Sequence, residues 1–272
     1  MRIALYGLGR MGRHHARHLG EMGHEVAVVD PNAGRADSTE GVDAVVVATP
    51  TITHGEIALP WLRRGVPVLV EKPITPSADV ARELAAFPNC YVGHIERFNP
   101  AFAAVAGCDA RFVQAERLAP WSDRSTDVDV VFDLMIHDLD LFLSFSNADV
   151  REVRANGLSV VSGRIDIVHA RVELTDGRVG VLTASRISRK AVRALRVFTP
   201  SGYTSCDLRD HVVVRVNGAL KEHTEPLEKY DALRAELSAF IAAVSGEGTF
   251  PVPASQAVRV IELAEAIRCA CT

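Results

Sequence analysis

The first thirty residues constrain the fold more than any other stretch of the chain. A short apolar run, Arg2 to Tyr6, predicts a strand, and the loop Gly7-Leu8-Gly9-Arg10-Met11-Gly12 follows it directly. We expect a helix from about Met11 to Met22 and a second strand from Glu25 to Val29, with Asp30 closing that strand. This order is typical of the βαβ unit that binds a dinucleotide.

Each glycine of the loop has a physical role in such a unit. Gly7 permits the tight turn, Gly9 lets backbone N–H groups approach a pyrophosphate, and Gly12 lets the helix pack closely on the strand. Arg10 and Met11 begin the helix, whose N-terminus presents unpaired N–H groups and the positive end of the helix dipole. We therefore expect these five residues to bind the cofactor phosphates. A glycine turn that binds nothing is the alternative.

Asp30 bears on which dinucleotide is bound. It lies 18 residues after Gly12, where a carboxylate can accept hydrogen bonds from both hydroxyls of an adenosine ribose. A 2′-phosphate at that place would meet a like charge, so we expect NAD in preference to NADP. Arg35 lies nearby in the sequence and makes this preference a moderate one.

Bulk properties exclude several other classes of protein. The chain has 272 residues, enough for two domains that each bury a core, and its net charge of −4 gives no electrostatic reason to expect nucleic acid or an anionic membrane. No leader segment or apolar run of about 18 residues is present, so we expect a cytoplasmic protein. Five cysteines without C-x-x-C spacing indicate free thiols, and no metal site is expected. His14 and His18 are one helical turn apart but have no third ligand.

The remainder of the first domain predicts a doubly wound parallel sheet with one trimmed edge. Only eleven residues, 31–41, precede the apolar run Val42 to Ala48. They cannot hold a helix, a strand and a second helix, so we expect a loop or a single turn there. Further helices are expected at 54–64 and 78–86, and further strands at 66–70 and 89–92.

Several polar residues follow these strands directly. Thr49, Pro50 and His54 follow the strand at 42–48, and Glu71 and Lys72 follow the strand at 66–70. Ligands of open α/β sheets bind at the carboxyl ends of the strands. We therefore expect these five residues at the cofactor crevice.

The second domain begins with a strand at 110–119 and a loop that contains Trp121 and Arg124. A helix at about 130–145 is apolar nearly all round, and Asp133, His137 and Asp140 share one of its faces. Because an unpaired buried charge costs several kcal/mol, these polar residues must be paired, solvated or used. We expect Asp140 to be a structural partner of backbone or arginine.

The pattern then changes to strands with short connections. Strands are expected at 153–161, 165–174, 179–187, 193–199, 203–207 and 212–216, with a hairpin turn at Asp176-Gly177, and helices at 230–245 and 254–271. The predicted fold class is α/β. It combines an N-terminal Rossmann domain, 1–97, with a C-terminal α+β domain, 98–272, that has an open, largely antiparallel sheet.

Six motifs follow one another along the chain: Gly7 to Gly12, Thr49-Pro50 to His54, Glu71-Lys72-Pro73, Arg97-Phe98-Asn99-Pro100, Asp133 with His137, and Glu236 with Phe240. Together they resemble the Gfo/Idh/MocA family of NAD(P)-dependent oxidoreductases along nearly the whole chain. The finer match, to the branch of UDP-N-acetylglucosamine 3-dehydrogenases, rests on residues 93–100 and 133–140. The chain departs from the family in the trimmed segment after Asp30, in the absence of a clear Gly-x-Ile-Gly near Gly107 and in Met135, where many members have glycine.

This resemblance implies roles for individual residues. Lys72, Asp133 and His137 correspond to the catalytic set, with His137 as the base and Lys72 as its electrostatic partner, or the reverse. Arg97 and Asn99 join them as substrate residues. Trp121 and Arg124 could meet a uracil and a phosphate, and the alternative is a loop that packs on its own domain. The resemblance also implies a homodimer or homotetramer assembled through the C-terminal sheet.

The implied activity is hydride transfer between a sugar secondary alcohol and NAD, with C3 of a UDP-N-acetylhexosamine as the first choice of substrate. One alternative is a dehydrogenase or reductase of a free sugar or a cyclic polyol such as inositol. Another is a catalytically silent NAD(P)-sensing regulator. The presence of Lys72, Asp133 and His137 together argues against a sensor, which needs no proton-handling residues.

Overall fold

The chain forms two compact units. Our computed structural model describes residues 1–122, 128–228 and 230–271. Unit 1 comprises Met1–Ile95 and Asp231–Ile261, and unit 2 comprises Glu96–Tyr230 and the chain from Glu262 onward. The sequence pattern placed the domain boundary after residue 97, close to the point at which the chain passes from unit 1 to unit 2, between Ile95 and Glu96. It assigned residues 231–261 to the second domain. They lie in unit 1.

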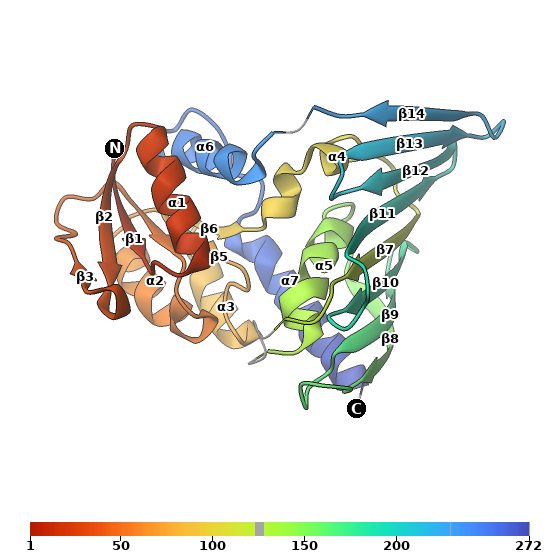
Figure 1. The fold of residues 1–272 in the computed structure, drawn as a ribbon, viewed down its shortest axis with the longest axis horizontal. Helices are drawn as coiled ribbons and strands as arrows, with labels where there is room; N and C mark the ends of the chain where they lie inside the picture. Colours follow the sequence, from red (N-terminus) through yellow and green to blue (C-terminus); the bar gives the residue numbers. More distant parts are fainter. Residues whose placement is uncertain (123–127, 229, 272) are drawn as a thin grey trace. The chain divides into compact units, whose positions relative to one another are not determined.

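Unit 1 is built on a six-stranded sheet in the order β3-β2-β1-β4-β5-β6 (Figure 1). All neighbours pair in parallel except β3, which runs antiparallel to β2. All four residues of β4 are fully buried, as expected of a parallel strand covered on both faces. The strands are β1 (Arg2–Tyr6), β2 (Glu25–Asp30), β3 (Arg35–Ala36), β4 (Ala44–Val47), β5 (Val68–Glu71) and β6 (Cys90–Gly93).

The helices of unit 1 agree with the sequence pattern to within a few residues. They are α1 (Arg10–Glu21), α2 (His54–Arg63), α3 (Ala78–Ala85) and α6 (Ala232–Val244). Helix α6 packs against α1, and Phe240 of α6 forms an aromatic cluster with Tyr91 and Phe250 at centroid distances of 5.3–6.5 Å. This apolar contact explains why a segment so late in the chain belongs to the first unit.

The trimmed edge of the sheet contains slightly more structure than the loop or single turn expected from sequence. A 3-10 turn at Pro31–Ala33 leads into the two-residue strand β3. Asp37 fixes this strand, because its carboxylate accepts the Val28 N–H at 2.9 Å and its own N–H donates to the Val28 carbonyl at 2.9 Å.

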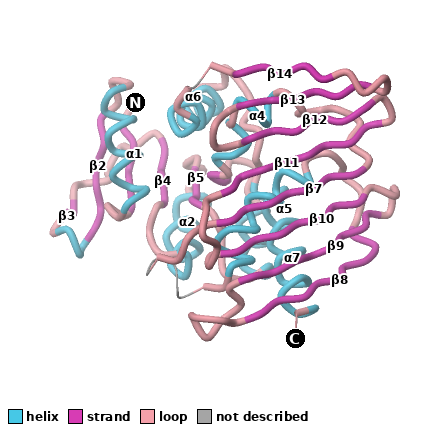
Figure 2. Tube along the Cα trace, turned by 45° about the vertical axis from the view of Figure 1, so that its right-hand side comes forward, coloured by secondary structure: helices cyan, strands magenta, loops and turns pink. Residues whose placement is uncertain are grey.

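Unit 2 is built on an eight-stranded sheet in the order β14-β13-β12-β11-β7-β10-β9-β8 (Figure 2). Among the described strands only β7 and β10 pair in parallel, so the expectation of a largely antiparallel sheet is confirmed. The strands are β7 (Phe112–Leu118), β8 (Val150–Leu158), β9 (Ile167–Leu174), β10 (Val179–Ser185), β11 (Val192–Thr199), β12 (Gly202–Asp207), β13 (Val212–Asn217) and β14 (Glu222–Pro226).

Helices cover one face of this sheet. Helices α4 (Pro100–Ala103) and α5 (Ile136–Leu143) contact it, and α7 (Ala254–Ala270) ends beside β8, where Cys271 approaches Gly157. On β9, Val168, Ala170 and Val172 are fully buried and alternate with more exposed residues. Within the described ranges, no helix is long and apolar enough to cross a membrane.

Helix α4, strand β14 and a π-helical turn of unit 2 were not expected from sequence. Strand β14 is polar and largely exposed, and it pairs with β13 as an edge strand that needs no apolar alternation. The helix expected from residue 130 begins as a π-helical turn, Val131–Met135, before α5. Asp129 supports this wider turn by accepting the N–H groups of Val131 and Phe132.

The close contact of α1 with β1 leads to a prediction about two glycines of the same helix. A Cβ on Gly12 would lie 1.9 Å from the Gly7 carbonyl oxygen, whereas a Cβ on Gly20 would meet nothing within 4 Å. We expect Gly12→Ala to lower the free energy of unfolding by about 3 kcal/mol, because backbone must move. Gly20→Ala, the control, should raise it by about 1 kcal/mol. Urea denaturation measures both, and equal effects would contradict the close contact.

Candidate active site

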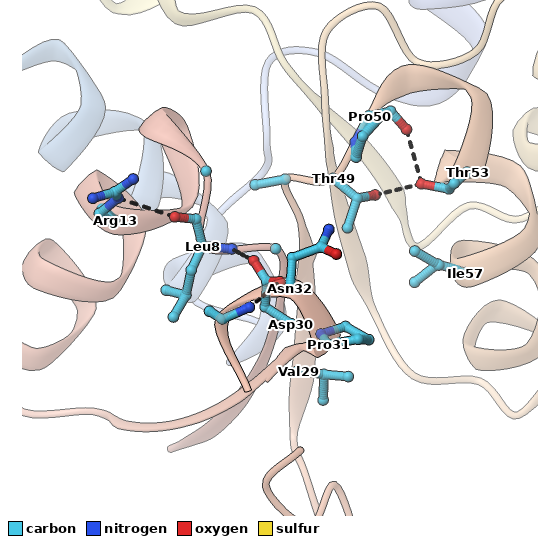
Figure 3. Close-up of a pocket in the computed structure, with 14 residues that line it drawn as sticks. Leu8, Arg13, Val29, Asp30, Pro31, Asn32, Thr49, Pro50, Thr53 and Ile57 are labelled. Carbon is cyan, nitrogen blue, oxygen red and sulfur yellow. Dashed lines mark hydrogen bonds between the residues drawn. The ribbon is translucent and has the colours of Figure 1, made fainter. Parts of the chain in front are cut away.

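Unit 1 contains a pocket of about 730 Å³ above the carboxyl ends of β1, β2 and β4. In Figure 3, the Leu8 backbone N–H and the Asp30 carboxylate face one another on one wall, and Thr49, Thr53 and Ile57 form the other. The complete lining is Gly7, Leu8, Gly9, Arg13, Val29, Asp30, Pro31, Asn32, Ala33, Ala48, Thr49, Pro50, Thr53 and Ile57.

The glycine loop has the geometry that a pyrophosphate site requires. Gly7 has φ +93°, a left-handed conformation that favours glycine. A Cβ on Gly9 would meet nothing within 4 Å, so this side of the loop is open toward the pocket. Helix α1 begins directly after Gly9, without a side-chain cap and without an acid in its first turn. Its first N–H groups can therefore bind an anion.

Asp30 is held at the pocket by the backbone. Its two carboxylate oxygens accept the N–H of Leu8 at 2.5 Å and the N–H of Ala33 at 3.1 Å. These two hydrogen bonds, that of Leu8 first, keep the pKa of Asp30 below its ordinary value. The carboxylate is therefore charged at neutral pH, and each oxygen keeps a lone pair for a ribose hydroxyl.

Arg35 is directed to a different partner. Its guanidinium forms an ion pair with Asp37 at 2.5 Å, and it does not line the pocket. The side-chain hydrogen bond with Asp37 raises the pKa of Arg35. In this arrangement, Asp37 pairs with the Arg35 guanidinium, which could otherwise bind a 2′-phosphate.

The structure divides the expected cofactor residues into two groups. Gly7, Gly9, Asp30, Thr49 and Pro50 line the pocket. The other six, Arg10, Met11, Gly12, His54, Glu71 and Lys72, are not among the lining residues.

Among this second group, Gly12 and His54 have clear structural roles. Gly12 allows the contact with Gly7 described above. His54 is buried, and its ring nitrogens lie 2.8 Å from the carbonyl oxygen of Thr49 and 3.0 Å from that of Pro73. Burial lowers the pKa of His54. In its neutral form the imidazole has one N–H, which donates to one of these two carbonyl oxygens.

Several lining residues were missed at the level of sequence. Arg13 could have been found from helical spacing, because it lies one turn after Gly9; its Nε donates to the Leu8 carbonyl at 3.0 Å. Thr53 could have been found from its place after the strand, and its hydroxyl donates to Thr49 Oγ1 at 2.8 Å. Asn32 gave no signal, because its position depends on the turn after β2.

In unit 2, the polar residues around α5 have distinct environments. Asp133 lies in the π-helical turn, a feature frequent at functional sites, and His137 follows in the first turn of α5. Both are half-buried. Asp140 is fully buried and paired with Arg97 at 2.7 Å, as expected of a structural acid.

Asp138 belongs to a buried network that the sequence did not indicate. Arg117 of β7 donates to Asp138 at 2.8 Å and to Glu96 at 2.8 Å, and all three side chains are at most 5% exposed. Burial raises the pKa of Asp138 and outweighs the attraction of Arg117. For Glu96 the balance is opposite: burial raises its pKa, but Arg117 and then Arg193 lower it below the ordinary value. The network anchors the helix that carries His137.

The remaining expected substrate residues are placed as follows. Arg97 is engaged by Asp140. Asn99 is buried, caps α4 through the Ala101 N–H and donates to Glu96 at 2.9 Å. Trp121 is 37% exposed, and Arg124 lies outside the described residues.

This fold and pocket define a dinucleotide-binding oxidoreductase, and comparison with known proteins identifies its family. Residues 1–88 match the model of the oxidoreductase family with an NAD-binding Rossmann fold, and residues 102–203 match the GFO/IDH/MocA C-terminal domain. The chain belongs to the Gfo/Idh/MocA family. It is therefore an NAD(P)-dependent dehydrogenase.

Individual relatives support this assignment over most of the chain. A UDP-N-acetylglucosamine 3-dehydrogenase of Acidithiobacillus ferrooxidans is 35% identical over 90% of this chain and 89% of that protein. A solved structure of UDP-N-acetylglucosamine 3-dehydrogenase from the same organism, in crystal form P21, is similar with a TM-score of 0.92. It is 32% identical, and the match covers 99% of this chain and 97% of that chain. Myo-inositol dehydrogenase Hyg17 of Streptomyces leeuwenhoekii is 32% identical over 68% of this chain and 70% of its own.

Proposed function

We propose that this protein oxidises a secondary hydroxyl of a nucleotide-activated amino sugar, with C3 of UDP-N-acetylglucosamine as the best candidate. The observation that carries the proposal is the 35% identity to a UDP-N-acetylglucosamine 3-dehydrogenase over 90% of the chain. The motif residues Lys72, Asp133 and His137 support it, because the chain keeps all three.

The proposed chemistry divides the alcohol's two hydrogens between different acceptors. Bound NAD+ supplies the hydride acceptor. His137 takes the hydroxyl proton, since imidazole exchanges a proton near neutral pH. Lys72 hydrogen-bonds the same oxygen and stabilises its developing negative charge, and Asp133 orients the imidazole or the sugar.

A pocket in unit 2 favours a substrate with a diphosphate. A hollow of about 540 Å³ is lined by Leu118, Ser188, Arg189, Lys190 and Val192, at the ends of β7 and β10. Within the described part of the chain, Arg189 and Lys190 form no ion pair with an acid. The Ser188 N–H donates to the Ala119 carbonyl at 3.0 Å, so the hollow adjoins the end of β7. Two cations without acids suit an anion better than a polyol.

The cofactor is proposed to be NAD rather than NADP. The charge on Asp30 would repel a 2′-phosphate, and the pairing of Arg35 with Asp37 supports the same preference. Assembly as a homodimer or homotetramer through the eight-stranded sheet is also proposed, and light scattering would test it. A cytoplasmic location stays a prediction.

The first prediction of the proposed function concerns turnover. UDP-N-acetylglucosamine with NAD+ should give reduced nicotinamide, measured by absorbance, and His137→Ala and Lys72→Ala should each lower kcat/KM by about 10²–10⁴-fold. His169→Ala, an exposed histidine on β9, and Lys221→Ala are the matched controls. Turnover of inositol but not of the nucleotide sugar would favour the polyol reading. NAD binding without any turnover would favour a sensor.

The second prediction concerns cofactor choice. Asp30→Asn should weaken NAD about tenfold, because charge-assisted hydrogen bonds to the ribose are lost, and should strengthen NADP. Asp43→Asn is the control, since Asp43 also accepts a backbone N–H, from Arg2 at 2.7 Å, but does not line the pocket. Calorimetry gives both Kd values. Tighter binding of NADP than of NAD by the wild type would overturn the preference.

The third prediction concerns the basic hollow of unit 2. The double variant Arg189→Gln and Lys190→Gln should raise KM for the nucleotide sugar about tenfold or more, because charge-assisted contacts to phosphate are lost, and should leave kcat largely unchanged. Lys221→Gln is the control for the loss of a surface cation. An unchanged KM would remove this hollow from substrate binding.

A further inference from the structure

Three titratable side chains from different elements are buried together in unit 1. His15 of α1 and Glu236 of α6 are both 0% exposed, and Glu71 at the end of β5 is 9% exposed. His15 Nε2 lies 2.7 Å from Glu71 Oε1, and the Lys72 backbone N–H donates to Glu71 Oε2 at 3.2 Å. The cluster therefore directly adjoins the lysine of the proposed catalytic set.

Glu236 has no hydrogen-bond partner for either carboxyl oxygen among the described residues. It shares its space with Glu71, because a Cβ on Gly93 would lie 3.4 Å from Glu236 Oε1 and 3.5 Å from Glu71 Cδ. Burial, and then the charge on Glu71, raise the pKa of Glu236 well above its ordinary value. Glu236 is therefore a neutral carboxylic acid at physiological pH.

Glu71 differs from Glu236 although it is also buried. Burial raises its pKa, but the hydrogen bond and charge of His15, followed by the charge of Lys72, bring the pKa below its ordinary value. His54 faces Glu71 from α2, and burial favours its neutral form. Two carboxyls in one buried space hold one proton between them, and these contacts assign that proton to Glu236.

We propose that His15, Glu71 and Glu236 form a charge-setting cluster, in which Glu236 holds the proton that the two carboxyls share and the charge of the Glu71 carboxylate, next to Lys72, holds Lys72 as an ammonium ion. This cluster decides between the two possible bases. An ammonium ion can stabilise the substrate oxygen but cannot accept its proton, so the proton goes to His137. The role in turnover rests on the proposed function, whereas the charge state of Lys72 does not.

The composition of the chain makes a direct test possible. It contains only four lysines, Lys72, Lys190, Lys221 and Lys229. Incorporation of [ε-13C]lysine gives few NMR signals, and Lys72→Arg identifies the signal of Lys72. In Glu71→Gln, Lys72 should lose its proton at a pH about 1 unit or more lower than in the wild type, because an adjacent anion is removed.

Glu236→Gln is the matched control at the same buried cluster. It replaces a neutral acid by a neutral amide, so the titration of Lys72 should stay as in the wild type. An equal shift in Glu236→Gln and Glu71→Gln would contradict the assignment of the charge to Glu71. An unshifted Lys72 in folded Glu71→Gln would overturn the cluster's role altogether.

The wild-type protein provides a measurement that does not depend on the folding of a variant. Lys72 should keep its proton at least up to the pH at which the other three lysines titrate, and its loss near neutral pH would overturn the proposal. The alkaline limb of kcat should move to lower pH in Glu71→Gln. Absence of turnover with the expected NMR shift would count against the proposed function alone.

Discussion

The parallel pairing of β1 with β2 and β4, and of β4 with β5, is the constraint on which the rest of unit 1 depends. Parallel strands end at the same edge, so Gly7, Asp30, Thr49 and Glu71 are brought together although up to 64 residues separate them in the chain. The close contact of Gly12 with Gly7 then directs the N-terminus of α1 toward that edge. The dinucleotide pocket results from this arrangement of backbone, and side chains refine it.

Buried charge is the second organising feature, and each unit uses it next to a residue of the proposed catalytic set. In unit 1, Glu71 is held by His15 immediately before Lys72. In unit 2, Arg117 is enclosed by Glu96 and Asp138, the residue that follows His137. Because leaving either charge unpaired would cost several kcal/mol, such pairs fix the local backbone closely. They thereby fix the backbone position from which the adjacent functional side chain extends.

The sequence predicted much of the fold, and its failures have physical reasons. The buried strands and the amphipathic helices were found to within a few residues because apolar periodicity reports burial directly. Strand β14 was missed because an exposed edge strand shows no such periodicity. The π-helical turn was missed because its wider spacing depends on Asp129, which precedes the apolar pattern. For the pocket, five expected cofactor residues line it, and Asn32 gave no signal.

The sequence by itself determined the class of this protein, because the glycine loop, the acid after the second strand and the Glu-Lys-Pro and Asp-x-x-x-His motifs are local patterns whose spacing carries their meaning. Tertiary structure alone decided which polar residues are partners. Arg97 meets Asp140, Arg117 meets Asp138, and Glu236 lies beside Glu71 across 165 residues of chain. Charge and burial act through space, so residues far apart in the chain determine each other's protonation, and no local pattern records that.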